Sequence, residues 1–362
     1  MAQALVLAAR GLGTTSPNPP VGAIVVRNRR IAGRGYHRRA GGAHAEVVAL
    51  KNAGPQARGA TLYVTLEPCC HLDKRTAPCV PLILESGIRR VVIATLDPNP
   101  KVKGRGVAAL RRAGLDVALG AARLEADRLI EPYRTRITTG RPRVTLKVAA
   151  TLDGKIATAR GESRWISSPQ ARRIVQGLRA GSDGILVGVG TILADDPSLT
   201  VRLRPARAPL RIVLDPKLRI PLQSKVLTDR QAPTLVVTTQ SSPKPQRELV
   251  ERLGAEVLVI PDKQGRVEWR VLLEELGRRG MNALLIEGGA EVNASALRSD
   301  AVDRVIFFLA PILLGGQDAI GAIGGRSPAR LTDALSIQDP MVSRIGSDIM
   351  VEGRPARNKS IS

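Results

Sequence analysis

Short apolar runs alternate with helical patterns along most of the chain. In the N-terminal part, residues that favour strands are concentrated in four runs, 21–28, 31–37, 61–68 and 89–98. Apolar residues at helical spacing follow or separate them, which predicts helices at 4–12, 44–54, 79–87 and 106–115. This alternation predicts an α/β fold, in which helices cover the faces of a sheet.

The alternation stops near residues 121–142, where the pattern predicts one helix followed by a basic turn with Gly140 and Pro142. It then starts again, with strand-like runs at 143–156, 184–190, 210–215, 232–239, 255–261, 282–289 and 303–316. We therefore predict two domains, 1–142 and 143–362, without an internal repeat. Residues 353–362 are expected to form a frayed tail.

The strongly positive net charge raises the question of whether the protein binds nucleic acid. The 362 residues include 55 Lys and Arg against 32 Asp and Glu, a net charge of +23 and a pI near 11.2. A protein this basic can bind nucleic acid. However, the arginines are scattered, and aromatic residues make up only 2% of the chain, too few for a surface that stacks bases. We favour an arginine-rich composition that suits phosphorylated small molecules, with no nucleic-acid partner.

Other features bear on the compartment. No apolar run approaches the roughly 20 residues that cross a bilayer, and the N-terminus lacks the basic and apolar regions of an export signal. Three cysteines, an odd number, argue against a disulfide framework. The sequence predicts a reduced, cytoplasmic protein with no membrane partner.

All three cysteines lie within residues 69–79, and the tripeptide His44-Ala45-Glu46 lies about twenty residues upstream. A catalytic zinc ion has three protein ligands and an open position for water, and zinc deaminases add a glutamate that moves protons. We predict His44, Cys69 and Cys79 as ligands and Glu46 as the proton shuttle. The second cysteine follows ten residues after the first, whereas the general deaminase pattern places it after three.

The alternative interpretation is a structural zinc knot, or simply buried cysteines. A structural site closes the fourth position with another cysteine or histidine, and Cys70 or His71 could do so. A knot has no need of Glu46, and adjacent cysteines rarely both bind one small ion. We therefore favour the catalytic site.

Two glycine turns point to a nucleotide. The G-x-G at 188–190 follows a strand, but Leu193 replaces the third glycine of the dinucleotide pattern. The turn Gly288-Gly289 is a stronger candidate, because a helix opens directly after it and helix N-termini bind phosphate. Ordinary turns between strands and helices are the alternative for both.

Several segments together resemble one family, the bifunctional riboflavin-biosynthesis deaminase/reductase. In the first half these are SPNPPVGAIVV (16–26), GRGYHRRAGGAHAE (33–46), TLYVTLEPCCHLDKRTAPC (61–79) and DPNPKVKGRG (97–106). In the second half they are residues 146–172, 178–202 and 286–297. The resemblance implies an α/β protein of two domains. The first would be a three-layer α/β/α domain of the cytidine-deaminase type, and the second an α/β domain of the dihydrofolate-reductase type.

For the deaminase half, the resemblance implies that His44, Cys69 and Cys79 hold one Zn²⁺ and that Glu46 is the proton donor. It also implies that four residues line the pocket of the pyrimidine and its ribose phosphate, namely Asn18, His37, Asp97 and Asn99; each of these could instead serve only its turn. The loop between the two cysteines, with DKRT at 73–76, is one residue longer than is usual in the family.

For the reductase half, the resemblance implies contacts to NADPH and to the substrate. The NADPH contacts would be Ala149, Trp165, Thr191, Asp195, Gly289, Ala290, Glu291, Val292, Asn293, Ala294 and Ser295. The substrate contacts would be Ser163, Arg179, Leu199, Arg202 and Glu287. Lys147 lies on a strand beside the cofactor segment, where it could polarise or protonate the reacting C1′ centre. Alternatively, Lys147 is an ordinary lysine at a strand end, and Trp165 belongs to the core.

The resemblance implies two consecutive steps of riboflavin biosynthesis: hydrolytic deamination of a phosphorylated diaminopyrimidine, then reduction of its ribosyl chain by NADPH. It also implies a homodimer or homotetramer. One rival is a deaminase that acts on bases in RNA, which would leave about 220 residues unexplained. Another is a basic RNA-binding protein that zinc stabilises, which would release no ammonia.

Overall fold

The structure is a computed structural model, and it describes residues 1–71, 77–203, 207–263 and 265–356. The chain divides into two compact units, Met1–Arg141 and Pro142–Ser362. Among the described residues, no helix has both the length and the apolar character needed to cross a membrane.

The first unit is built on a sheet of five strands in the order β2-β1-β3-β4-β5. Strand β1 runs antiparallel to both β2 and β3, whereas β3, β4 and β5 are parallel. The strands are β1 (Gly22–Arg27), β2 (Arg30–Tyr36), β3 (Thr61–Leu66), β4 (Arg90–Thr95) and β5 (Asp116–Leu119). The helices are α1 (Ala2–Ala9), α2 (Ala45–Ala53), α3 (Cys79–Glu85), α4 (Arg105–Arg112), α5 (Arg123–Leu129) and α6 (Glu131–Thr139), with a 3-10 turn at Gly54–Ala57.

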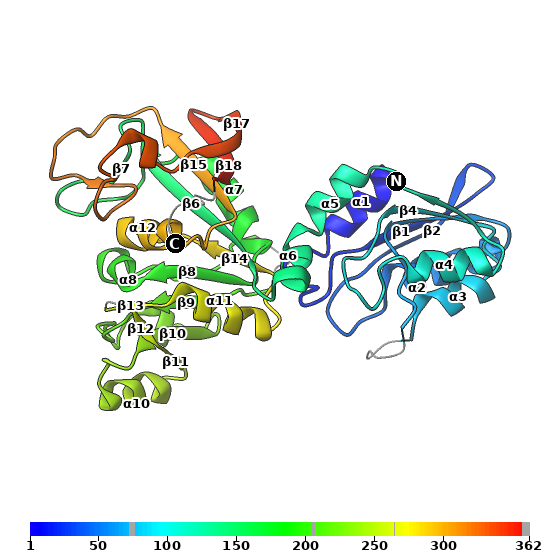
Figure 1. The fold of residues 1–362 in the computed structure, drawn as a ribbon, viewed down its shortest axis with the longest axis horizontal. Helices are drawn as coiled ribbons and strands as arrows, with labels where there is room; N and C mark the ends of the chain where they lie inside the picture. The colour runs from blue at the N-terminus through cyan, green and yellow to red at the C-terminus, as the bar shows by residue number, and fades with distance from the viewer. Residues whose placement is uncertain (72–76, 204–206, 264, 357–362) are drawn as a thin grey trace. The chain divides into compact units, whose positions relative to one another are not determined.

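Glycines in the first two strands let helices pack directly on both faces of this sheet. A Cβ atom at Gly33 or Gly35 would lie 2.1 or 2.2 Å from a backbone oxygen of α2. A Cβ atom at Gly22 would lie 2.0 Å from the backbone oxygen of Ala4 in α1. Gly22 pairs with Tyr36, whereas Gly35 pairs with the neighbouring Ala23, so the two helices cover opposite faces. Figure 1 shows α2, α3 and α4 together on one side, which completes three layers.

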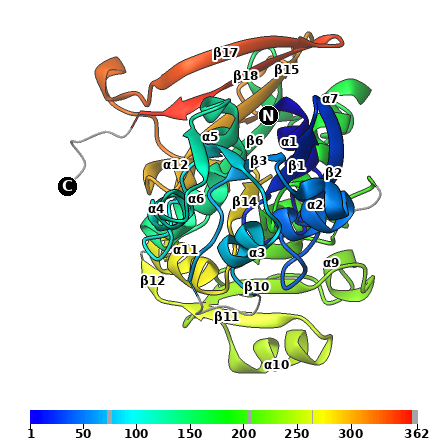
Figure 2. The ribbon, with the colours of Figure 1, turned by 90° about the vertical axis from the view of Figure 1, so that its right-hand side faces the viewer.

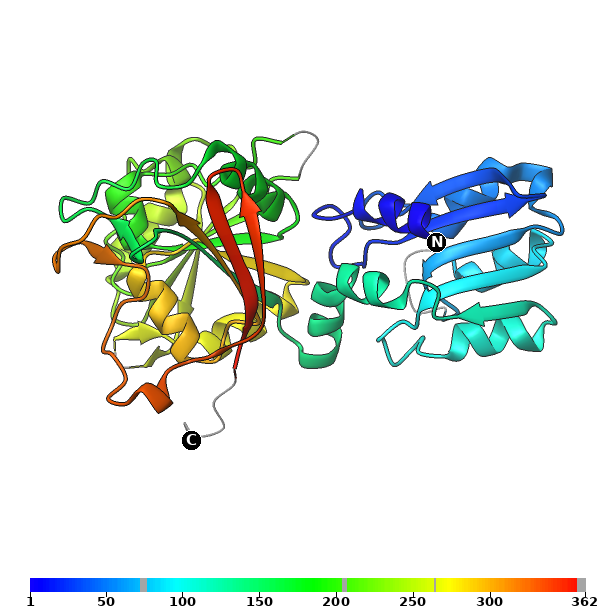
Figure 3. The same ribbon diagram turned by 90° about the horizontal axis from the view of Figure 1, so that it is seen from above.

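The second unit is built on a sheet of nine strands in the order β11-β10-β9-β8-β14-β6-β15-β18-β17. The strands from β11 to β15 are parallel, and β18 and β17 join antiparallel at one edge. Figures 2 and 3 show this terminal hairpin in red along the sheet. The strands are β6 (Arg143–Thr151), β8 (Gly184–Gly188), β9 (Leu210–Leu214), β10 (Thr234–Thr239), β11 (Glu256–Ile260), β14 (Ala283–Ile286), β15 (Arg304–Ala310), β17 (Ile337–Ile345) and β18 (Asp348–Pro355).

Helices cover both faces of the larger sheet because its central strands are apolar on both sides. On one face, Leu146 and Leu186 pack with Trp269 and Leu272 of α11. On the other, Val187 and its neighbours pack against α8, α9 and α10, while Phe308 packs against α7. The helices are α7 (Pro169–Ala180), α8 (Val189–Asp195), α9 (Lys225–Thr228), α10 (Lys244–Arg252), α11 (Trp269–Arg278) and α12 (Ala290–Arg298), with a 3-10 turn at Leu331–Asp333. Two small ladders pair β7 (Lys155–Ala157) with β16 (Ile320–Gly321) and β12 (Asp262–Lys263) with β13 (Arg266–Val267).

The structure corrects three sequence predictions. The single helix expected within 121–142 is two helices, because Ile130 leaves helical geometry between α5 and α6. The strand expected at 303–316 ends at Ala310. Residues 353–355 of the expected tail belong to β18, where Gly353 pairs with Val305; residues 357–362 lie outside the described residues.

Candidate functional site

The first site lies where β3 ends and two helices begin. His44 caps the N-terminus of α2, Cys79 is the first residue of α3, and Cys69 lies three residues beyond the end of β3. The His44 Nδ1 atom lies 3.2 Å from Cys79 Sγ and 3.5 Å from Cys69 Sγ. The fold therefore brings the three predicted ligands together.

These three side chains fit a zinc ion. Tetrahedral zinc bonds of about 2.0 Å to nitrogen and 2.3 Å to sulfur separate the two ligand atoms by about 3.5 Å, close to the observed distances. The three ligand atoms all lie within 4.8 Å of one another, and among the described residues neither Cys70 nor His71 joins this set. Such a set of donors, two sulfurs and one imidazole, is that of a catalytic site rather than a closed structural knot.

Glu46 lies in the first turn of α2, two residues after the histidine ligand, and is 3% exposed. Burial raises the pKa of the Glu46 carboxyl, and the nearby Cys69 sulfur raises it further. A carboxyl with a raised pKa can both accept and return a proton near neutral pH.

His37 lies next to this cluster, and Asn18 is hydrogen-bonded to it. The His37 ring is buried and lies 5.4 Å from the His44 ring, centroid to centroid. Its Nδ1 atom is 3.0 Å from the Ala43 carbonyl oxygen, and its Nε2 atom is 3.1 Å from Asn18 Nδ2. Burial lowers the pKa of His37, so the neutral ring donates to the carbonyl and accepts from the amide. That pair of bonds fixes the orientation of Asn18.

Sequence reasoning missed Glu67, which holds the turn containing Asp97. The Glu67 carboxylate is 3% exposed and accepts hydrogen bonds from the backbone N–H groups of Asp97 (3.3 Å), Gly104 (2.9 Å) and Val107 (3.0 Å). These bonds fasten the turn and the start of α4 to the strand that leads to Cys69. Its only local signal is an acidic residue directly after an apolar strand, which does not distinguish it from a surface acid.

The second site is a cavity of about 1020 Å³ in the second unit. Most of the predicted residues line it: Lys147, Ala149, Ser163, Trp165, Arg179, Thr191, Asp195, Leu199, Arg202, Glu287, Gly289, Ala290, Glu291 and Val292. Asn293, Ala294 and Ser295 are not among the lining residues. Asn293 instead donates to the Ala322 carbonyl oxygen, and Ser295 accepts from the Trp269 indole.

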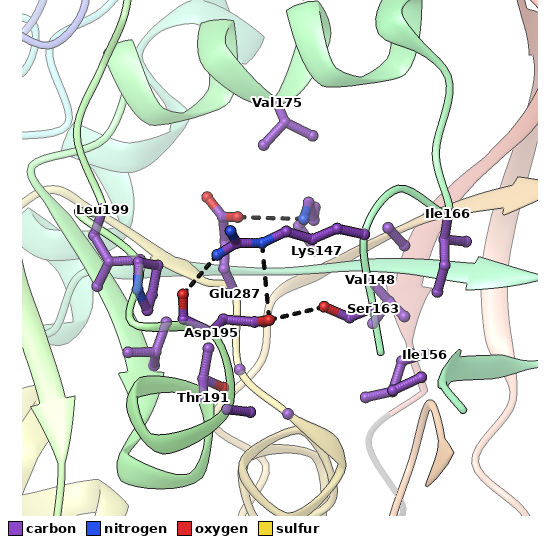
Figure 4. A pocket seen from close by; sticks show the side chains of 18 of the residues that line it. Lys147, Val148, Ile156, Ser163, Ile166, Val175, Thr191, Asp195, Leu199 and Glu287 are labelled. Carbon is purple, nitrogen blue, oxygen red and sulfur yellow. Dashed lines mark hydrogen bonds and ion pairs between the residues drawn. The ribbon is translucent and has the colours of Figure 1, made fainter. Parts of the chain in front are cut away.

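A buried carboxylate, Glu287, lies at the wall of this cavity with two cations, of which Figure 4 shows Lys147. Arg179 donates to Glu287 from Nε (2.6 Å) and from Nη2 (3.1 Å), and Lys147 donates from Nζ (3.2 Å). Burial alone would raise the pKa of Glu287, but Lys147 and Arg179 outweigh it and hold that pKa at about 2. The carboxylate therefore stays charged and keeps Lys147 aimed into the cavity.

Ser163, Asp195 and Trp165 also line the cavity. The Ser163 hydroxyl donates to Asp195 Oδ1 at 2.9 Å, as Figure 4 shows. Trp165 is 64% exposed at the cavity, so the alternative that it belongs to the core is wrong; Trp269 is the buried tryptophan. Sequence reasoning missed Arg172, whose guanidinium carbon lies 4.6 Å from the centre of the Trp165 ring.

The Gly288-Gly289 turn suits a phosphate group of a dinucleotide. A Cβ atom at Gly288 would lie 2.7 Å from the Val292 side chain, so this position requires glycine. Gly289 caps α12, and the N–H groups in the first turn of a helix have no partner within it. Because Gly289, Ala290 and Glu291 line the cavity, these donors lie at its wall.

Comparison with known proteins gives matches over both units. A family model for the cytidine and deoxycytidylate deaminase zinc-binding region matches residues 1–95, and one for the RibD C-terminal domain matches 142–351. The chain is 44% identical over 352 residues to the riboflavin biosynthesis protein RibD of Aquifex aeolicus, covering 97% of this chain and 96% of that one. It is 42% identical to the RibD of Escherichia coli strain K12, covering 96% of each.

The chain belongs to the RibD family. Solved structures agree: the RibD of Acinetobacter baumannii superposes with a TM-score of 0.87 at 37% identity, covering 98% of each chain. A deaminase/reductase from Thermotoga maritima superposes with a TM-score of 0.85 at 37% identity, covering 98% of this chain and 97% of that one.

Membership of the RibD family settles the class of function. The chain is a bifunctional enzyme of riboflavin biosynthesis, with a zinc-dependent deaminase half of the cytidine-deaminase type and an NADPH-dependent reductase half of the dihydrofolate-reductase type. The rival interpretations, an RNA deaminase and an RNA-binding zinc protein, are therefore wrong. Residues 72–76, in the loop between Cys69 and Cys79 that is one residue longer than usual in the family, lie outside the described residues.

Proposed function

We propose that the first unit hydrolyses the 2-amino group of 2,5-diamino-6-(5-phosphoribosylamino)pyrimidin-4-one and releases ammonia. The Thermotoga maritima relative is described as a diaminohydroxyphosphoribosylaminopyrimidine deaminase, which supports this substrate. The observation that carries the proposal is the set of His44, Cys69 and Cys79 with the buried acid Glu46 beside it.

In this proposal, His44, Cys69 and Cys79 hold the metal. Zinc held there would supply a water molecule of lowered pKa as the nucleophile for the amidine carbon. Glu46 accepts the proton that the water loses and delivers it to the departing ammonia. Burial of the Glu46 carboxyl raises its pKa and so favours the protonated form that makes the second transfer.

The pocket walls position the ring. Asn18, which His37 holds by a hydrogen bond, offers an amide to the pyrimidine. Asp97 and Asn99 come from the turn that Glu67 fastens, and they would contact the ring or the ribose phosphate. Because each of these side chains is held by a second residue, the substrate meets a preformed surface.

We further propose that the second unit reduces the ribosyl chain of the deaminated product to a ribityl chain. Lys147 would protonate or polarise the group at the reacting C1′ centre while hydride arrives from NADPH. The NADPH contacts would be Ala149, Trp165, Thr191, Asp195 and the segment from Gly289 to Val292, which lines the cavity at the start of α12. The substrate contacts would be Ser163, Arg179, Leu199, Arg202 and Glu287. A guanidinium such as that of Arg202 suits the 5′-phosphate, because it can donate two parallel hydrogen bonds.

A coupled assay on the zinc-loaded full chain tests both proposals. Ammonia release from the diaminopyrimidine phosphate should come first, followed by oxidation of NADPH in proportion to the deaminated product. Ammonia release without NADPH oxidation would refute the second proposal alone. No ammonia release from this substrate, at full zinc content, would refute the first. Light scattering of the same sample tests the expected homodimer or homotetramer.

A further inference from the structure

Helix α6 is the last element of the first unit, and it contacts one of the turns proposed to line the deaminase pocket. The Tyr133 side chain is 6% exposed, and its hydroxyl donates to Asp97 Oδ1 at 3.1 Å. The same carboxylate oxygen accepts the backbone N–H of Asn99 at 2.8 Å. Tyr133 therefore fixes the carboxylate about which this turn is folded.

One helical turn further on, Arg136 contacts the other turn. Its Nη2 atom donates to the Pro17 carbonyl oxygen at 2.9 Å. Pro17 directly precedes Asn18, whose amide is bonded to His37. Residues three apart share a helix face, so α6 presents Tyr133 and Arg136 on the same side, toward two turns that lie eighty residues apart in the sequence.

The distance between the two turns decides whether their side chains can meet one substrate together. Turns lack the ladder of hydrogen bonds that holds strands, and a site on turns is accurate only when a second layer of contacts holds it. A single rigid helix that contacts both turns supplies that layer. Asp97 is held from its other side by the bond from its own N–H to Glu67.

We propose that Tyr133 and Arg136 are positioning residues of the deaminase site, which set the separation of the turns that carry Asn18 and Asp97. They act through other residues and are not catalytic. This inference rests on the proposed deaminase function, and it adds two residues whose side chains that function does not by itself require.

The test uses the full chain loaded with zinc and the diaminopyrimidine phosphate as substrate. Tyr133→Phe removes only the hydroxyl, and Arg136→Ala removes the guanidinium. Each variant loses a hydrogen bond in which one partner is charged, and water replaces part of it. We expect KM for deamination to rise about five- to tenfold in either variant, with kcat reduced less than threefold and zinc content unchanged. Arg136→Lys should recover part of the loss, because lysine can still donate to a carbonyl oxygen.

Two control variants change residues with similar side chains that have no such role. Tyr63→Phe removes a hydroxyl from β3, and Arg128→Ala removes an exposed arginine from α5; both should keep the wild-type KM. The reductase rate on the deaminated substrate should be unchanged in every variant. The inference is overturned if KM stays within twofold of wild type, if kcat alone falls, or if zinc is lost in parallel with activity. A wild-type chain that does not deaminate would instead refute the function on which the inference rests.

Discussion

The Glu287→Gln variant gives the most informative perturbation of the second unit. The native carboxylate accepts three hydrogen bonds from two cations, and the three side chains are only 7% (Glu287), 17% (Arg179) and 14% (Lys147) exposed. Glutamine keeps the shape but carries no charge and has one acceptor oxygen instead of two. The variant therefore leaves Lys147 and Arg179 largely buried without a compensating negative charge.

The size of the effect follows from the shifted pKa. A fall in the Glu287 pKa from its ordinary 4.5 to about 2 corresponds to about 3 kcal/mol of stabilisation at neutral pH. Removing one partner of a buried ion pair costs about 3–5 kcal/mol, which agrees. In a unit of about 220 residues, 3 kcal/mol lowers Tm by about 6–12 °C. Because the folded pKa is depressed, this stabilisation is present above about pH 4.5 and is lost as the pH falls toward 2.

Scanning calorimetry of the full chain measures the Tm, and NADPH oxidation measures the site. We expect the Glu287→Gln transition of the second unit at lower temperature and the reductase rate reduced at least tenfold, with ammonia release unchanged. The control is Glu274→Gln on α11, whose carboxylate is 56% exposed and pairs with Arg270; such a pair contributes at most about 0.5 kcal/mol. A Glu287→Gln chain with the Tm and reductase rate of this control would refute the reasoning.

Three further predictions concern the first unit, and the last of them has its control in the second unit. Glu46→Gln should lower deaminase kcat by about 10²–10⁴-fold with zinc retained; full turnover would contradict its role. Burial raises the pKa of Asp97 to about 6, so ionisation costs stability as the pH rises through 6. In urea unfolding, Asp97→Asn should therefore gain up to about 3 kcal/mol relative to wild type between pH 4 and 7.5; a constant difference would contradict this. Gly33→Ala should lower Tm, because its Cβ would lie 2.1 Å from the Ala49 oxygen, whereas Gly177→Ala in α7, with open space, should raise stability by about 0.5–1 kcal/mol; equal shifts would count against the packing argument.

The sequence predicted the elements that carry strong apolar patterns. Helices at Ala45–Ala53 and Cys79–Glu85 and the central strands of both sheets are confirmed, because a buried strand or an amphipathic helix leaves a local signal. It did not predict β17 and β18. Strand β17 is exposed along most of its length. Because neither of its faces is buried, its sequence lacks the alternation of apolar and polar residues that indicates a strand. The break at Ile130 did leave a signal, which the prediction missed: Pro132 follows two residues later, and proline favours the first turn of a helix.

The candidate sites divide in the same way. The zinc ligands could be predicted because cysteine and histidine are rare in this chain and are spaced in a recognisable manner. The roles of Glu67, Tyr133 and Arg172 could not be predicted, because only the folded chain brings each of them near its partner. These partners are backbone N–H groups for Glu67, the Asp97 carboxylate for Tyr133 and the Trp165 ring for Arg172. Such supporting residues belong to common residue types, and nothing local separates them from surface acids, core tyrosines or solvated arginines.

The central claim is that three side chains hold one zinc ion with an open position beside Glu46. The most direct test removes zinc from the full chain with a chelator, returns it in steps, and measures bound zinc and ammonia release at each step. We predict ammonia release in proportion to zinc, up to one ion per chain, with NADPH oxidation on the deaminated substrate constant throughout. Full ammonia release from metal-free chain would contradict the account.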